Sequence, residues 1–262
     1  PINNDGTLNI DEYKSMLNPN VKFVFVNHVS NTLGTINPIE QIIELAHKNK
    51  SQVLIDGAQG AAHLKINLKE LNVDYYVASA HKLCGPTGVG FLYGKSELLK
   101  SLPAYQGGGE MISNVTFEKT EYADLPHKFE AGTPNIAGVI AFGAALDYMN
   151  LIGFDNIENH EKELLDYATE NLKKIDGIKI YGDNKQKISV ISFNIGDHHP
   201  SDIGSILDQF GIAVRTGQHC TQPIMDFYKI PGTVRASFSF YNTKSEIDLF
   251  IDALIKASKM LG

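Results

Sequence analysis

Lys82 lies in a short polar segment that directly follows an expected buried strand. The strand is expected over 73–78, and the residues after it are Ser79, Ala80, His81 and Lys82. An ammonium group at such a position loses hydration, and burial lowers the pKa of a lysine and makes it available as a Schiff-base nucleophile. A lysine in a lone Ser-x-His-Lys segment is more often a surface lysine at a turn, so the lysine alone does not establish a site.

Asp56 changes the interpretation of this lysine. It ends the expected buried strand of 53–55, about 26 residues before Lys82, and Gln59 follows it. Pyridoxal phosphate (PLP) needs an anion beside its pyridinium nitrogen, so that the ring stays protonated and acts as an electron sink. A strand-terminal Asp by itself is more often a helix cap or a metal ligand. Paired with the lysine segment, Asp56 indicates a PLP site.

Cys220 is the other candidate for chemistry. It ends the segment 215–220, in which the positive potential of Arg215 and His219 is expected to favour a thiolate over a thiol. A cysteine in an α/β protein is usually a buried apolar filler. That interpretation suits Cys84, whereas Cys220 has a glycine and polar residues before it.

Two further segments are conspicuous but indicate no site. His198 and His199 are adjacent and have no acidic or cysteine partner at ligand spacing, which favours solvated loop histidines over a metal site. The glycines within 106–109 lack the preceding strand and the spacing of a dinucleotide fingerprint. We therefore expect neither a bound metal ion nor a dinucleotide.

Alternating strand and helix signals in the first half of the chain position the lysine and the aspartate. Apolar and β-branched runs predict strands over 21–26, 53–55, 73–78 and 89–93, and a helix over 39–50. This alternation predicts a parallel or mixed α/β sheet with right-handed crossovers. Open α/β sheets bind ligands beyond the carboxyl ends of their strands, where the polar residues collect.

The second half of the chain predicts a separate α+β unit. A long apolar helix over 134–151 leads into it. Helices are then expected over 156–174, 202–210 and after 243, with strands over 178–181, 188–195 and 234–238. We expect two domains: a PLP-binding large domain over 1–150 and a small domain over 151–262 that carries the cysteine loop.

The composition is that of an ordinary globular enzyme. The chain has 262 residues, 43% of them hydrophobic, and a net charge of −7 from 23 Lys and Arg against 30 Asp and Glu. An acidic chain without basic runs argues against binding of nucleic acid or anionic membranes, and no apolar stretch approaches the roughly 18 residues of a membrane span. Two cysteines make no disulfide framework, so a cytoplasmic enzyme is expected.

Six motifs occur in the order found in one enzyme family. They are HVSNTLGTINP (28–38), LIDGAQGAAH (54–63), SAHKLCGPTGVGFLYG (79–94), FEAGTPN (129–135), GIAVRTGQHC (211–220) and VRASFSFYNT (234–243). The chain resembles the PLP-dependent cysteine desulfurases of the class V aminotransferase fold. The cysteine motif, which lacks a long inserted loop, resembles the SufS-type group (group II). The resemblance implies PLP fold type I, as in aspartate aminotransferase, and a homodimer with PLP at the subunit interface.

The resemblance assigns a role to each candidate residue. It implies that Lys82 holds the cofactor and removes the Cα proton of the substrate, and that Cys220 accepts sulfur. The other implied cofactor contacts are Asp56 at the pyridinium nitrogen, Gln59 at the phenolic oxygen, Ser79 and His81 at the phosphate, Thr133 at the phosphate of the opposite subunit, and Asn31. Asn31 and Arg235 resemble the substrate-carboxylate clamp, which suits the planar guanidinium fork. A lone Arg in a strand would otherwise be a surface charge.

The implied function is that of an L-cysteine desulfurase. Such an enzyme converts L-cysteine to L-alanine and supplies persulfide sulfur, here from Cys220, to iron–sulfur cluster assembly. Selenocysteine lyase activity is the nearest alternative, because the same electron sink and clamp serve either chalcogen. An aminotransferase of the same fold is less expected, because it would not need Cys220. A catalytically silent fragment without PLP is the remaining alternative.

The sulfur acceptor is expected to be a SufE-like protein. In pairings with zinc-bearing SufU-like acceptors, the family has a zinc-competing histidine just before the Asp of an HP-x-D segment. This chain has Ser201 there, directly before Asp202, and serine is a poor zinc ligand. The neighbouring His199 would have to shift its loop to substitute.

The resemblance also implies that the large domain is incomplete at its N-terminus. Residues resembling DGTLNIDEY (5–13) lie well inside the large domain of the family. A histidine that stacks on PLP and a phosphate-binding threonine would precede them. We therefore expect exposed sheet edges and apolar surface, and poor PLP binding by these 262 residues taken alone.

Overall fold

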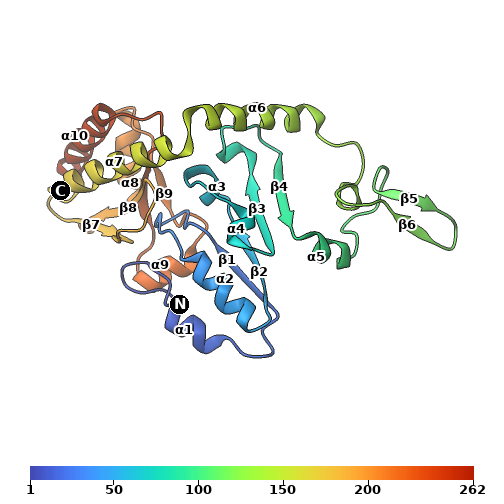
Figure 1. The fold of residues 1–262 in the computed structure, drawn as a ribbon. Coiled ribbons are helices and arrows are strands. Elements are labelled where there is room, and N and C mark those ends of the chain that lie inside the picture. The colour runs from blue at the N-terminus through green and yellow to red at the C-terminus, as the bar shows by residue number, and fades with distance from the viewer.

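The computed structural model describes residues 1–262 and contains two sheets, each with its own hydrophobic core (Figure 1). The first sheet has the strand order β1-β2-β3-β4 and the second β7-β8-β10-β9. A separate hairpin of β5 and β6 projects away from both (Figure 1).

The first sheet is mixed, as the sequence predicts. Its strands are β1 (Phe23–Asn27), β2 (Gln52–Asp56), β3 (Tyr75–Ser79) and β4 (Gly90–Gly94). The first three are parallel to one another, and β4 runs antiparallel to β3. Helices α2 (Ile39–Lys48), α3 (Gly60–His63) and α4 (Leu68–Leu71) connect the parallel strands, which is the α/β arrangement expected.

The core of the first sheet forms between α2, the strands and α6 (Ile136–Ile152). Val53 and Ile55 alternate along β2 and are fully buried, and α2 covers them with Ile39, Ile43 and Ala46. Helix α6 runs along the first sheet and continues into α7 (Phe154–Leu172) toward the second (Figure 1). The two helices are bent by 72° at their break, and no single helix is long and apolar enough to cross a membrane.

The second sheet is antiparallel throughout. Its strands are β7 (Ile178–Tyr181), β8 (Val190–Ile195), β9 (Arg215–Gly217) and β10 (Thr233–Ser237). Helices α7, α8 (Pro200–Gln209) and α10 (Lys244–Leu261) bury their apolar faces with β8 and β10 in one core, and α9 (Gln222–Tyr228) follows β9. Thr243 starts α10 through a reciprocal capping box with Glu246, which is why the sequence marks this helix start clearly.

Other short elements lie where the sequence predicts none. These are α1 (Ile10–Met16), the 3₁₀ turns η1 (Ala80–Lys82) and η2 (His127–Phe129), α5 (Ser96–Ser101), β5 (Ile112–Val115) and β6 (Thr120–Tyr122). Every residue of β5 and β6 is exposed, so the hairpin carries no buried alternation for a pattern to reveal.

Apolar side chains are exposed on both the sheet and α6. Phe25 of β1 is 69% exposed and Leu92 of β4 49%, and on α6 Ile140 is 70% and Leu151 86% exposed. The exposed apolar surface expected from the sequence is therefore present.

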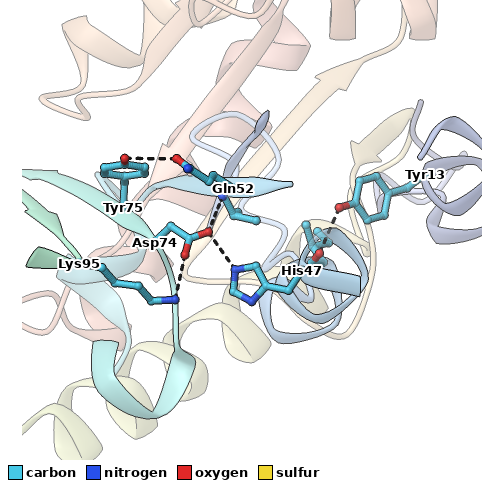
Figure 2. A network of polar contacts seen from close by, with 8 residues as sticks. Tyr13, His47, Gln52, Asp74, Tyr75 and Lys95 are labelled. Atoms are coloured by element: carbon cyan, nitrogen blue, oxygen red, sulfur yellow. Dashed lines mark hydrogen bonds and ion pairs between the residues drawn. The ribbon is translucent and has the colours of Figure 1, made fainter. Parts of the chain in front are cut away.

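A buried carboxylate fastens the amino ends of β2 and β3 (Figure 2). Asp74 accepts hydrogen bonds from Lys95 Nζ at 2.8 Å and Val53 N–H at 2.8 Å, and lies 2.9 Å from His47 Nε2. Burial opposes ionisation, but these hydrogen bonds outweigh it and hold the pKa of Asp74 below its usual value. Tyr13 ties α1 to α2 by donating to a carbonyl oxygen at 3.1 Å. This network lies at the sheet edge opposite the candidate site.

Candidate active site

The parallel strands deliver several candidate residues to one edge of the first sheet. Asp56 is the last residue of β2 and Ser79 the last of β3, and Asn31 follows β1. The register pairs Asn27 with Asp56 and Asp56 with Val77, so the carboxyl ends of the three strands lie together. The expected polar edge is therefore formed by the sheet itself.

Asp56 and Gln59 have side-chain groups to spare at this edge. The Asp56 side chain is exposed, and one of its oxygens accepts from Ala58 N–H at 2.9 Å. Gln59 is half-buried at the N-cap of α3 and makes no capping bond with its side chain. A free carboxylate oxygen and a free amide suit the pyridinium nitrogen and the phenolic oxygen of PLP.

Two glycines after Asp56, Gly57 and Gly60, leave room for a buried pair of side chains, Tyr76 and His28. A Cβ on Gly57 would lie 1.9 Å from the Tyr76 ring, and one on Gly60 would lie 2.5 Å from His28 Nδ1. Tyr76 Oη and His28 Nδ1 are 3.2 Å apart. Sequence analysis missed this pair, and the two glycines of the LIDGAQG segment are the signal that would have indicated a close approach.

The protonation of this pair follows from its burial. Burial lowers the pKa of His28 to about 4, with a smaller opposing effect of Glu40. Burial also raises the pKa of Tyr76, and the negative charge of Asp56 adds to the shift. At neutral pH the pair is therefore an uncharged hydroxyl within hydrogen-bond distance of an uncharged imidazole.

The segment after β3 places a hydroxyl, an imidazole and an amine in one tight turn. Ser79 Oγ and His81 Nδ1 are 3.0 Å apart, and the half-buried Lys82 ends the 3₁₀ turn. Gly85 returns to this turn so closely that a Cβ there would lie 2.9 Å from the Ala80 carbonyl oxygen. Hydroxyl and imidazole groups are good phosphate ligands, and an amine such as that of Lys82 can form a Schiff base with a carbonyl compound.

Arg235 of β10, in the second sheet, contacts the loop that follows β1 of the first sheet. Its Nη1 donates to the carbonyl oxygen of Asn31 at 2.8 Å, and its Nε is buried without a partner. Arg215 lies opposite it on β9. Burial lowers the pKa of Arg235, and the charge of Arg215 lowers it further. Two neighbouring cationic groups with an unsatisfied donor form a good site for a carboxylate.

Cys220 lies at a tight turn whose two central residues are both left-handed. The N–H of Thr221 donates to the carbonyl of Gln218 at 2.9 Å, and φ is 54° at His219 and 61° at Cys220. Positive φ at both central positions is the mark of a type I′ turn. The thiol is exposed, and Arg215 Nη2 lies 3.4 Å from Sγ.

The expected positive charge of His219 is wrong. His219 is 2% exposed, and its Nε2 donates to Thr233, 3.1 Å from the carbonyl oxygen and 2.9 Å from Oγ1. Burial, and then the charge of Arg235, lower the pKa of His219 to about 4, so the imidazole is uncharged at neutral pH. The positive charge beside the sulfur therefore comes from Arg215.

The expectation that Cys84 is a buried filler is also wrong. Cys84 is exposed and has a left-handed backbone with φ of 58°. What burial its thiol retains raises its pKa, which favours the neutral thiol. Unlike Cys220, it has no hydrogen-bonded guanidinium.

Thr133 and the two loop histidines stand apart from these groups. Thr133 is exposed in the segment before α6 and makes no hydrogen bond to another candidate residue. His199 caps α8, where its Nδ1 accepts from Ser201 N–H at 3.3 Å. No group of three or more His, Cys, Asp or Glu side chains is arranged to hold a metal ion.

Comparison with known proteins identifies the family of the chain. The family model described as aminotransferase class V matches residues 1–250. A cysteine desulfurase of Cronobacter sakazakii is 47% identical over 263 residues, which cover 100% of this chain and 64% of that protein. The chain thus spans less than two thirds of the length of this curated relative.

Solved structures show the same fold. The cysteine desulfurase CsdA of Escherichia coli, in its S-sulfonic acid form, has a TM-score of 0.95 and 36% identity over 99% of this chain and 65% of that one. The apo cysteine desulfurase of Thermococcus onnurineus has a TM-score of 0.95 and 35% identity, with the same shares covered. With its α/β fold and a family match that covers nearly its whole length, the chain belongs to the class V aminotransferase family and is a homologue of the cysteine desulfurases.

Proposed function

We propose that this protein is a PLP-dependent L-cysteine desulfurase of the SufS type. It would convert L-cysteine to L-alanine and pass persulfide sulfur toward iron–sulfur cluster assembly in the cytoplasm. The relatives named cysteine desulfurase support the activity. The observation that carries the proposal is that Asn31 makes hydrogen bonds to both the Cys220 turn and Arg235. Its side chain donates to the His219 carbonyl at 2.8 Å, and its own carbonyl accepts from Arg235 at 2.8 Å.

This double contact joins the carboxylate site to the sulfur-accepting turn. Arg235 would hold the carboxylate of L-cysteine, and its buried Nε would gain the partner that it lacks. The substrate side chain would then extend toward the turn of Cys220, because Asn31 contacts both. An enzyme that only exchanged amino groups would have no use for a thiol at this position.

The residues of the chain divide the reaction between them. Bound PLP supplies the electron sink for the Cα carbon. Lys82 would take the proton from Cα. Cys220 Sγ, with the guanidinium of Arg215 3.4 Å away, would attack the substrate sulfur, so that an S–S bond forms while the C–S bond breaks. The remaining three-carbon unit leaves as alanine after gaining protons, and the enzyme holds the persulfide.

The finer assignments are part of the same proposal. The cysteine turn is short and directly follows β9, which suits the SufS-type group. His199 is engaged as the cap of α8, which favours a SufE-like acceptor over a zinc-bearing one. The break between α6 and α7 lies at Gly153, with φ of 88°, and supports two domains over 1–150 and 151–262. The exposed Thr133 is free to reach a second subunit in a homodimer.

Serine substitutions at the two cysteines test the proposal. Cys220→Ser should retain PLP, seen in the absorbance of the bound cofactor, and lose alanine formation from L-cysteine by several orders of magnitude. Cys84→Ser is the matched control, because it changes another exposed thiol of the chain. It should keep alanine formation nearly intact. Near-normal turnover by Cys220→Ser would overturn the proposed function.

A further inference from the structure

The turn that carries Cys220 needs support from outside itself. Two consecutive residues with a Cβ adopt left-handed backbone, with φ of 54° at His219 and 61° at Cys220. This conformation is disfavoured for all residues except glycine, and Asn or Asp tolerate it best. A His-Cys pair in a type I′ turn therefore persists because surrounding contacts hold it there.

Thr32 provides such a contact from the loop after β1. Its Oγ1 lies 2.7 Å from Oγ1 of Thr221, the last residue of the turn. Thr32 is completely buried, and its carbonyl oxygen accepts from Ser192 Oγ of β8 at 2.6 Å. The hydroxyl of Thr32 is therefore held in place before it meets the turn.

The direction of the hydrogen bond follows from counting protons. Thr221 Oγ1 donates its only proton to the Gln218 carbonyl, 2.9 Å away. The proton between the two threonines must then come from Thr32. The result is a relay in which Thr32 donates to Thr221 and Thr221 donates across the turn to Gln218.

Thr221 does not use its side chain as a helix cap. It occupies the N-cap of α9, where a threonine hydroxyl usually accepts from a backbone N–H of the first helical turn. Here its side chain makes no capping bond. Its hydroxyl donates to the Gln218 carbonyl instead, so it stabilises the turn and not the start of α9.

We propose that Thr32 is a positioning residue that acts through Thr221 to hold Cys220 Sγ beside Arg215. The role in sulfur transfer rests on the proposed function, whereas the effect on the exposure and reactivity of Cys220 does not. Without the Thr32 hydroxyl, the turn loses one of its supports and Sγ moves more freely away from the guanidinium at 3.4 Å. A sulfur that attacks as an anion then loses part of the positive charge beside it.

Four variants of the purified holoprotein test this role. Thr32→Val removes the hydroxyl at nearly constant shape, and Thr32→Ser restores it. Thr221→Ala removes the second member of the relay at a half-buried position that is less demanding for folding. Thr35→Val is the matched control, because Thr35 is also buried in the same loop and its Oγ1 accepts from Asn184 at 3.0 Å, away from the turn.

The primary measurement is the rate at which iodoacetamide alkylates Cys220 at pH 7, followed on the Cys220 peptide by mass spectrometry. Thr32→Val and Thr221→Ala should slow it by about five-fold, the ratio expected for one ordinary hydrogen bond. Thr32→Ser and Thr35→Val should stay within about two-fold of the parent. Equal alkylation rates in all four variants would overturn the inference, and Thr221→Ala decides it if Thr32→Val does not fold.

Turnover gives a second and separate readout. The two slowed variants should lose kcat for L-cysteine while KM and bound PLP stay unchanged, because Arg235 and Lys82 are untouched. A rise in KM instead would show that Thr32 supports the substrate site and not the turn. If the parent protein produces no alanine, the proposed function fails while the alkylation rates still decide the role of Thr32.

Discussion

Arg235 is a donor that the folded chain leaves incompletely satisfied. Its Nη1 is committed to the Asn31 carbonyl at 2.8 Å, while its Nε is buried without a partner. A buried donor without a partner costs about 1–3 kcal/mol, and a carboxylate that accepted a hydrogen bond from Nε would remove this cost. The nearby Arg215 adds a second positive charge. The charge and the free donor therefore both favour binding of an anion at this position.

Replacement of Arg235 by lysine should separate the contribution of the planar guanidinium from that of the positive charge. A lysine keeps a positive charge but presents a compact ammonium in place of the planar fork. We expect Arg235→Lys to raise KM for L-cysteine by about ten-fold or more, equivalent to the loss of one charge-assisted hydrogen bond. Steady-state alanine formation measures this, with cofactor absorbance as the control for PLP content. An unchanged KM would contradict the clamp.

At the scale of elements, the end of β1 and the start of α3 meet through a buried imidazole. His28 follows β1, is 7% exposed, and lies where a side chain on Gly60 would collide with it. Its Nδ1 lies 3.2 Å from Tyr76 Oη of β3. The packing of β1, β3 and α3 around His28 therefore depends on a neutral imidazole, because protonation would place an unpaired charge in a buried position.

This dependence predicts a loss of stability in mild acid. Burial lowers the pKa of His28 from 6.5 to about 4, so between these pH values the unfolded chain binds a proton that the folded chain refuses. The free energy of unfolding should therefore fall as the pH decreases from about 6.5 to 4, with up to about 1.4 kcal/mol per pH unit from this group. His28→Asn should make the fall shallower in urea titrations. A slope that His28→Asn does not alter would show that the imidazole is not neutral in the folded chain.

At the scale of the whole molecule, Glu161 connects the two sheets. It is 3% exposed on α7, lies 2.7 Å from His63 Nδ1 of α3, and accepts from Ser189 Oγ at 3.2 Å and Ser239 Oγ at 3.3 Å. Helix α3 lies between β2 and β3 of the first sheet, and the serines flank strands of the second. The position of β10, and with it Arg235, relative to Asp56 therefore depends on a polar cluster between the sheets.

Removal of this carboxylate should destabilise the molecule strongly. Glu161→Leu leaves buried polar partners unsatisfied, which typically costs about 3–5 kcal/mol and should lower Tm by roughly 5–10 °C. The control is Glu163→Gln, also on α7, which breaks an exposed ion pair with Lys244 of α10 and should change Tm by about 1 °C or less. Differential scanning calorimetry compares the two, and equal small shifts would contradict the connecting role.

The elements that the sequence predicts well are those with one buried face. The strand over 178–181 is found with the same bounds, and α10 begins after Thr243 because its capping box is local. Strand β9 covers only residues 215–217, and the β5–β6 hairpin buries nothing, so neither has a detectable period. Predictability here follows from burial and local hydrogen bonding.

By itself the sequence determined which groups could do chemistry and where along the strands they stand. Asp56 and Ser79 end buried strands, and parallel strands bring such ends to one edge by geometry alone. The charge at Cys220 was decided only by the tertiary structure, because His219 and Arg215 look alike as neighbours in sequence but one is 2% exposed and the other reaches Sγ at 3.4 Å. The contacts of Asn31 with β10 and the cysteine turn span 204 and 188 residues. Such distant partners meet only when both sheets have packed, and no local pattern encodes that.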